Sequence, residues 1–206
     1  MSKFSKVPVN LVDHIQVNVG FITNSFVPDT GVAGSVLGAI SSDGFTFNSN
    51  PSFQDFGEDV GGVPPNTMQM KRIQYFDPSA SGGFKDCTPE LAEFLIGAAD
   101  SEDDPSSDTS GVLHKVQITP RHEIKSTDFY GDLWIIGDYS GVNTGNNAGF
   151  IAVHLKNCFN NTGFQWSTAN FGKGTFSFDF HGHYDLADLD EVPFDVYMQY
   201  YVENAG

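Results

Sequence analysis

Hydrophobic and polar residues alternate along several stretches of the chain, which is the pattern of half-buried β-strands. The clearest alternation lies at residues 15–21, 114–119, 151–156, 176–185 and 194–201. Residues 36–50 and 69–76 are further predicted strands. Residues 132–137 are a continuous apolar run, as expected of a strand covered on both faces. A polar turn through Asp188 and Asp190 predicts that the last two strands form a hairpin.

One segment has the spacing of an amphipathic helix instead. Its apolar residues follow i, i+3, i+4 and i+7 spacing, at Leu91, Phe94, Leu95 and Ala98. Thr88 can cap the N-terminus, and Pro89 suits the first helical position. The sequence therefore predicts a helix at about 88–99, lying on a sheet. The expected fold is mainly β: a β-sandwich or barrel-like domain with one flanking α-helix, forming a single domain over residues 1–206.

Two long polar segments separate these elements. Residues 51–66 contain Pro64 and Pro65 and are expected to form a long connection. Residues 100–110 are rich in Asp and Ser. We interpret this second segment as an acidic surface loop, because it lacks the central Gly and terminal Glu of a calcium-binding EF-hand loop.

Charge narrows the partners that the surface can bind. The chain has 26 acidic and ten basic residues among 206, a formal net charge of −16. Gripping nucleic acid or an anionic membrane requires clustered Lys and Arg, so both are excluded as tightly bound partners. A surface that must repel nucleic acid remains compatible with this charge.

The location of the protein is predicted from what the sequence lacks. The first residues have no apolar core of a signal peptide, and no apolar run approaches the roughly 20 residues of a membrane helix. We therefore expect a soluble protein made in the cytosol, in which Cys87 and Cys158 are free thiols. A single bridge between them is the alternative.

Two clusters could carry chemistry. His181, His183 and Asp185 are two residues apart on a predicted strand, so they could approach one metal ion. Residues 121–123 (Arg-His-Glu) offer an acid–base group after Pro120. In both cases we favour the plainer interpretation, a polar strand face and a surface turn. We expect no enzymatic activity, no metal and no cofactor.

Aromatic residues leave a second interpretation open. Trp166 and Phe171 lie in the Gly- and Asn-rich residues 160–174, and Tyr139 precedes another such stretch. Exposed aromatic side chains there could stack on sugars, as in a lectin, or lie in a subunit contact.

The order of these segments resembles a known family. The resemblance covers most of the chain, with the helix between its two halves. It rests on residues 44–59 (GFTFNSNPSFQDFGED), 132–139 (DLWIIGDY), 149–157 (GFIAVHLKN), 176–184 (FSFDFHGHY) and 192–197 (VPFDVY). In these segments the chain resembles the major tail (tail tube) proteins of long-tailed, non-contractile bacteriophages.

The resemblance implies a structural subunit. Such subunits form hexameric rings that stack into a tube, and their strands join into one inner β-barrel with the helix outside. The partners would be further copies, the tape-measure protein and the tail-terminator or distal tail proteins, with no membrane. The protein would be assembled in the host cytoplasm and located in the virion. The loop at residues 51–66 would reach the adjacent ring through Phe53, Asp55, Phe56, Glu58 and Asp59.

The resemblance also implies a role for the net negative charge of the chain. DNA must pass through the lumen during ejection without binding, and acidic walls repel phosphates. Asp43 and Asp179 are candidate lumen residues, because neighbouring apolar residues face the other way; solvated outer positions are the alternative for both. Two other functions stay open: a carbohydrate-binding module, and a particle-decoration or tail-completion protein on a virion.

Overall fold

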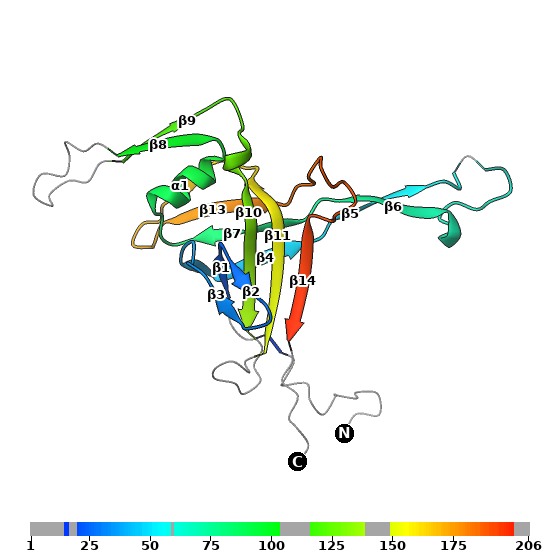
Figure 1. Cartoon of the computed structure of the whole chain (residues 1–206), viewed down its shortest axis with the longest axis horizontal. Coiled ribbons are helices and arrows are strands. Elements are labelled where there is room, and N and C mark those ends of the chain that lie inside the picture. The colour runs from blue at the N-terminus through cyan, green and yellow to red at the C-terminus, as the bar shows by residue number, and fades with distance from the viewer. Residues whose placement is uncertain (1–14, 17–19, 59, 104–115, 139–148, 200–206) are drawn as a thin grey trace, which may run out of the picture.

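The computed structural model describes residues 15–16, 20–58, 60–103, 116–138 and 149–199 (Figure 1). It is mainly β, with a large antiparallel sheet and one α-helix among the described residues, as predicted. Eight strands form this sheet: β1 (Phe21–Thr23), β4 (Ile40–Asn48), β7 (Ser79–Phe84), β10 (Tyr130–Asp138), β11 (Phe150–Asn160), β12 (Gln165–Ser167), β13 (Thr175–His181) and β14 (Phe194–Gln199).

Strand β11 divides the sheet into two layers. Residues 150–155 pair with β14 on one side and with β10 on the other, and β1 pairs with β10. We call these four strands the β10 sheet. Farther along β11, Phe159 and Asn160 pair with β13, which continues through β7 to β4, with β12 on the edge of β13. These strands are the β7 sheet. Asn157 lies between the two pairings with a φ of 47°, a conformation that Asn tolerates better than most residues.

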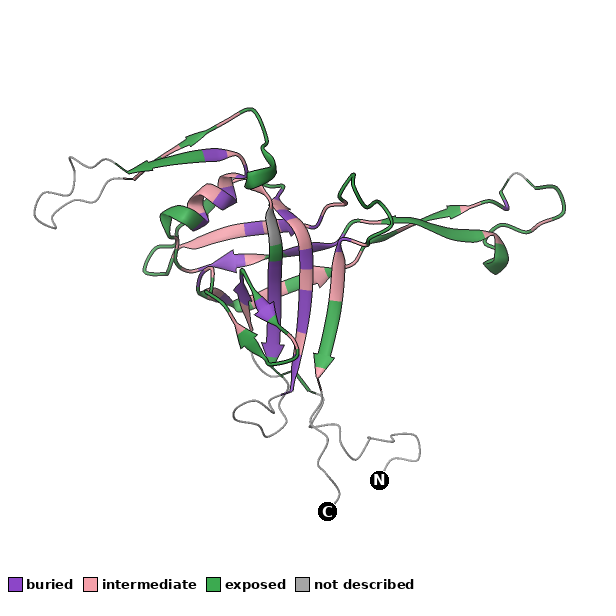
Figure 2. Cartoon of the chain, viewed as in Figure 1, coloured by how far each residue is buried: buried purple, intermediate pink, exposed green. Residues whose placement is uncertain are grey.

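The core lies between the two sheets, as Figure 2 shows by the buried residues there. Both sheets and the helix supply it, through Leu133, Ile135, Val153, Leu155, Phe84, Phe178, Phe180, Leu91, Phe94 and Leu95. Phe180 stacks on Phe94 and on Phe178, at ring-centroid distances of 4.8 and 4.6 Å. The Phe alternation of the sequence therefore fills the inner face of the β7 sheet.

The apolar run at residues 132–137 is buried on both faces, as predicted. Trp134 and Ile136 point away from the main core. A small hairpin of β2 (Phe26–Val27) and β3 (Val32–Ala33) covers them, with the Phe26 ring centroid 5.4 Å from that of Trp134. Every residue of this strand segment therefore needs an apolar or small side chain, except the exposed Asp132 at its start.

The helix, α1, spans Pro89–Ile96 and ends earlier than predicted. Thr88 caps it, because its Oγ1 accepts a hydrogen bond from the backbone N–H of Leu91 at 3.2 Å. Gly97 ends it with a φ of 94°, a conformation that glycine adopts without strain. The segment predicted as a loop at residues 100–110 begins as a strand instead: β8 (Ala99–Asp103) pairs with β9 (Val116–Pro120). Residues 104–110 lie outside the described residues.

The predicted loop at residues 51–66 is half of a hairpin. Strand β5 (Pro51–Asp55) pairs with β6 (Lys71–Phe76), and a short 3₁₀ turn, η2 (Met68–Met70), precedes β6. We call residues 51–76 the arm. It projects from the body as a two-stranded ribbon (Figure 1). The prediction of a loop was wrong for residues 51–55, because a two-proline turn signal marks only the tip and the flanking residues pair.

The predicted hairpin between the last two strands does not form. Strand β13 pairs with β7, and β14 pairs with β11. The intervening segment is tied to other elements: Gly182 N–H donates to the Pro78 carbonyl at 3.0 Å, and Lys156 N–H to that of Pro193 at 3.0 Å. Polar turn residues indicated a reversal but could not indicate that the two strands join different sheets.

Candidate assembly surfaces

The arm has one apolar and one polar face. Phe53 pairs with Ile73 on one face. Tyr75 pairs with Ser52, and the register shift between Ser52 and Phe53 places Tyr75 on the opposite face. The side chains of Phe53, Ile73 and Tyr75 are 51, 52 and 52% exposed. Gln54 and Gln74 lie on the other face, joined by a hydrogen bond of 2.7 Å. Within the described part of the chain, no layer covers the two half-exposed apolar side chains, Phe53 and Ile73, on this face of the ribbon.

The arm tip is ordered by Asp55. One carboxylate oxygen accepts from the Gly57 N–H at 2.9 Å, and the other from the Asn66 N–H at 2.7 Å. Lys71 lies over the Phe53 ring, 5.2 Å from its centroid, and donates to the Asn66 side chain. Asp55, expected from the resemblance to reach a neighbouring ring, therefore also organises the arm itself.

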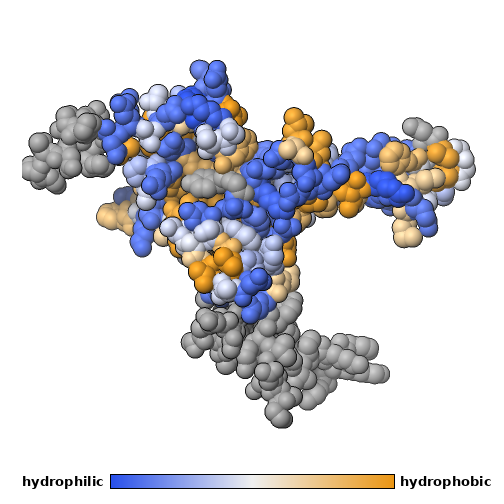
Figure 3. All heavy atoms as spheres, viewed as in Figure 1, coloured by the Kyte–Doolittle hydropathy of each residue, from blue (hydrophilic) through white to orange (hydrophobic). Residues whose placement is uncertain are grey.

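The other residues expected in an inter-ring contact differ in placement. Phe53 and Phe56 are about half exposed, and Glu58 is exposed. Asp59 lies outside the described residues. Met68, which the sequence analysis missed, is 78% exposed beside the tip. Figure 3 shows apolar surface on the arm, well away from the body, and on the loop before β14. Ile73, within the predicted strand at residues 69–76, was the signal for the missed half of the arm face.

The base of the arm is pinned by a histidine. His181 Nδ1 lies 2.9 Å from a carboxylate oxygen of Asp77, and Nε2 lies 3.3 Å from one of Asp179. Burial lowers the pKa of His181, but its hydrogen bonds to both carboxylates outweigh this and raise the pKa above the usual 6.5. The phenol of Tyr184 accepts from the Phe76 N–H at 2.9 Å. Side chains of the body thus hold the point where the arm leaves it.

The cluster that suggested a metal ligand set does not converge. His183 Nδ1 lies 3.0 Å from the Asn157 carbonyl, whereas Asp185 accepts from the Ala187 N–H at 2.9 Å. His181 is occupied by its two carboxylates. Among the described residues, no group of three or more His, Cys, Asp or Glu is placed to hold a metal ion.

The two candidate lumen residues lie in different settings. Asp179 is on the outer face of the β7 sheet, in register with Ser81 and Thr46, while Phe178 and Phe180 face the core. This row consists of small polar or acidic side chains, and His181 lies beside it, against Asp179. Asp43 lies in a bulge of β4, where the register shifts, and lines a cleft between the two sheets rather than that outer row.

The Arg-His-Glu segment has a structural role. Arg121 pairs with Asp128 and Asp100 and donates to the Ala99 carbonyl at 2.9 Å, so it joins the base of the β8–β9 hairpin to the 3₁₀ turn η4 (Ser126–Asp128). Burial opposes ionisation of Asp128, but the hydrogen bonds from Arg121 and from the Lys125 N–H lower its pKa. His122 and Glu123 are exposed.

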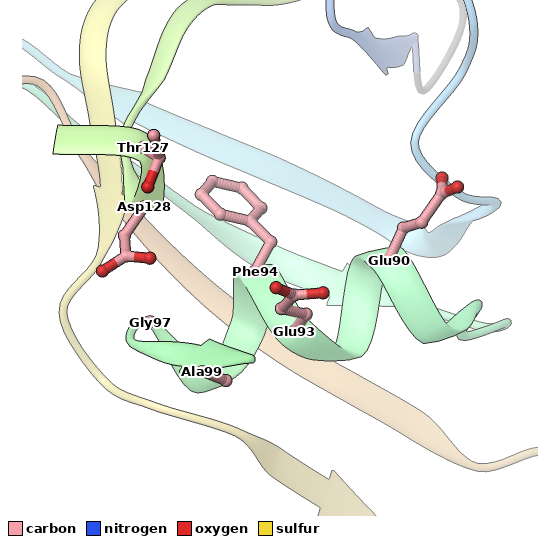
Figure 4. Close-up of a pocket in the computed structure, with 7 residues that line it drawn as sticks. All are labelled: Glu90, Glu93, Phe94, Gly97, Ala99, Thr127 and Asp128. Carbon is pink, nitrogen blue, oxygen red and sulfur yellow. The ribbon is translucent and has the colours of Figure 1, made fainter. Parts of the chain in front are cut away.

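A shallow hollow of about 260 Å³ lies between α1 and η4 (Figure 4). The helix supplies Glu90, Glu93 and Phe94, and η4 supplies Thr127 and Asp128. Asp128 is already neutralised by Arg121, and its lowered pKa keeps it ionised at neutral pH. A general acid would require the opposite shift, so Asp128 does not suit that role here.

A further set of exposed aromatic side chains lies in β12 and in the residues on either side of it. Trp166 is 63% exposed and lies parallel to Phe176, with ring centroids 6.1 Å apart. Phe164 is 41% exposed, and Phe171 is fully exposed in the turn before β13. Tyr139 lies outside the described residues. The indole of Trp166, backed by the parallel ring of Phe176, offers a flat aromatic surface to a sugar or to another protein.

Both cysteines are free thiols, as predicted. Cys158 is fully buried, and burial raises its pKa well above the usual value. Cys87 is half-buried, and burial together with the Asp86 carboxylate raises its pKa.

No helix in the described part of the chain is long and apolar enough to cross a membrane. The chain matches no protein-family model, and no curated protein sequence is significantly similar to it.

Proposed function

We propose that this chain is the structural subunit of a phage tail tube, in which hexameric rings stack and an acidic lumen conducts DNA during ejection. The observation that carries the proposal is the arm, a projecting ribbon with an uncovered apolar face. The segment resemblance to tail tube proteins supplies the identity of the assembly, and the arm supports it.

The arm requires a partner on energetic grounds. An isolated two-stranded hairpin is at best marginally stable in water. Fully burying an Ile or Phe side chain contributes about 1.5–3 kcal/mol, so covering the exposed half of Phe53 or Ile73 would add roughly 1 kcal/mol each. The tip residues Phe56 and Met68 are exposed as well. A copy in the adjacent ring would supply the missing layer.

The outer face of the β7 sheet suits the wall of a DNA passage. Its central row consists of Thr46, Ser81 and Asp179, which are small and polar or acidic. The row itself holds no bulky or basic side chain, and the one imidazole beside it, His181, is paired with Asp179 and Asp77. Six copies would together carry a formal charge of −96, six times −16, which repels phosphates along the passage. The strands of this sheet lead directly into the arm, so a wall and a ring-to-ring contact would be continuous.

A carbohydrate-binding module, or a decoration protein on a virion, is the second candidate. Trp166 favours it, because an exposed indole backed by the parallel ring of Phe176 is a platform on which sugars stack. This function requires a monomer or a particle-bound copy with measurable glycan affinity. It offers no reason for the apolar face of the arm.

Sedimentation velocity of the full chain across a wide concentration range tests the proposal. We expect a transition from monomer to large assemblies, because stacking is a mass-action process. The variant Ile73→Ser should stop growth at single rings, and Gln74→Ser, on the polar face of the same strand, should assemble like the wild type. Unchanged stacking of Ile73→Ser would show that the arm face is not the ring-to-ring contact.

A further inference from the structure

At one edge of the β7 sheet, the core-facing side of the sheet ends in an exposed aromatic residue, Trp166. Trp166 of β12 pairs with Phe176 of β13, which pairs with the core residue Phe84 of β7. Paired residues share a face, so Trp166 lies on the same side of the sheet as the core. No further strand among the described residues covers β12, and Trp166 remains 63% exposed.

At the opposite edge of the same sheet, none of the described strands closes the apolar layer. A cleft of about 500 Å³ lies between the two sheets beside the edge strand β4. Its apolar lining comes from both sheets: Phe45, Phe47, Ile135, Ile151 and Val153. On the neighbouring edge strand β14, Val196 and Met198 pair with Val153 and Ile151, and they are 43 and 51% exposed.

The charges at the two edges are opposite. The chain has only ten basic residues. One of them, Lys85, donates to the Thr175 hydroxyl at 2.6 Å, next to β12, and Lys173 is exposed in the turn between β12 and β13. The cleft, in contrast, is lined by Asp43. The two edges are therefore complementary: one has an exposed aromatic side chain and lysines, and the other has an apolar cleft and a carboxylate.

We propose that the β12 edge of one copy enters the cleft beside β4 of the next copy, with Trp166 in the cleft. Contact between two different surfaces of the same chain is heterologous, and it closes into a ring when the rotation between copies permits. The inference rests on the proposed ring-forming function and names the surfaces that build the ring. The cleft has room for an indole, and a Trp side chain buries about 150–250 Å² on docking.

Tryptophan fluorescence of the full chain tests this contact. The sequence has two tryptophans, Trp134 and Trp166, and Trp134 is buried. The variant Trp134→Phe therefore leaves Trp166 as the only indole. Its emission should be red and accessible to iodide in dilute samples, then blue-shifted and protected once sedimentation shows assembly. If Trp134→Phe does not fold, the difference spectrum between wild type and Trp166→Phe reports the same change.

A mixing experiment identifies the cleft as the acceptor. Chains with Trp166 as the only indole are mixed with chains carrying Cys87→Ser, Trp134→Phe, Trp166→Phe and a nitroxide on Ser42→Cys, which lines the cleft. We expect the nitroxide to quench Trp166 on assembly. The same label on Thr30→Cys, in the exposed β2–β3 turn, should quench far less.

The outcomes separate this inference from the proposed function. Assembly with Trp166 still exposed, or with equal quenching by both labels, overturns the inference and leaves the tube intact. Absence of assembly at every concentration overturns both. A blue shift on adding oligosaccharide to monomers, without assembly, supports the sugar platform and also overturns the inference. Trp166→Ser should raise the concentration needed for assembly by about tenfold or more, and Val32→Ser, at another exposed site, should not.

Discussion

Replacing Asp55 with alanine tests whether the arm tip is ordered by one carboxylate. Asp55 accepts from the backbone N–H groups of Gly57 and Asn66, at 2.9 and 2.7 Å, and so joins the two ends of the tip loop. Alanine leaves both donors without this acceptor. Because the tip lies far from the core cluster, we expect the loss to be local and the melting temperature to be nearly unchanged.

The size of the effect follows from these two bonds. A hydrogen bond to a charged group contributes about 1.5–3 kcal/mol, and the half-exposed position of Asp55 favours the lower end. Losing both destabilises the ordered tip by about 3 kcal/mol, and each 1.4 kcal/mol is a factor of ten. Amide protection at Gly57 and Asn66 should therefore fall roughly 100-fold, or vanish if the tip is less stable than that. Asp55→Asn keeps one acceptor oxygen and should lose about tenfold.

Hydrogen exchange of the full chain, below the concentration at which it assembles, measures this protection. Glu58→Gln, an exposed change in the same loop, is the matched control and should leave both amides as in the wild type. Equal exchange rates in wild type and Asp55→Ala would refute the ordering role. Disorder of the tip with unchanged stacking would show that the role is real and that the tip is not needed between rings.

Three further predictions concern the body. Because the folded pKa of His181 is raised above 6.5, its contribution to stability is fully present below about pH 6.5 and is lost as the pH rises through the raised value. The unfolding free energies of wild type and His181→Gln, from urea titrations, should thus differ most below about pH 6.5 and converge as the pH rises through the raised pKa of His181. A difference that stays constant with pH contradicts the pairing with Asp77. Phe180→Ala removes a fully buried ring and should cost about 3–5 kcal/mol in the same titration, and a cost below about 1 kcal/mol would mean that the ring is not in the core. Cys158 should resist a thiol reagent until the chain unfolds, while Cys87 reacts slowly; rapid native modification of both would contradict the burial of Cys158.

The sequence was most informative where one periodicity dominated. Alternating Phe residues placed Phe178 and Phe180 on the core face, and the cap at Thr88 marked the helix start. These features depend on neighbours within a few residues of each other. The run at residues 132–137 likewise indicated a strand buried on both faces, although not that the β2–β3 hairpin would cover one of them.

Features that depend on distant pairing were not predictable in the same way. The arm was taken for a loop because β5 acquires its strand conformation only by pairing with β6, 15 residues later. The partners of β13 and β14 are set by β11, which changes sheets near Asn157. His181 gave a metal-like pattern, but its carboxylate partner Asp77 is 104 residues away along the chain. Local patterns carry no information on such contacts.

Electron microscopy of the purified full chain at high concentration tests the central claim, that copies of this chain build a tube. The account predicts ring-shaped top views with six-fold symmetry and a central opening, together with side views of stacked rings. A monodisperse monomer at every concentration and salt condition, with neither rings nor tubes, would contradict it.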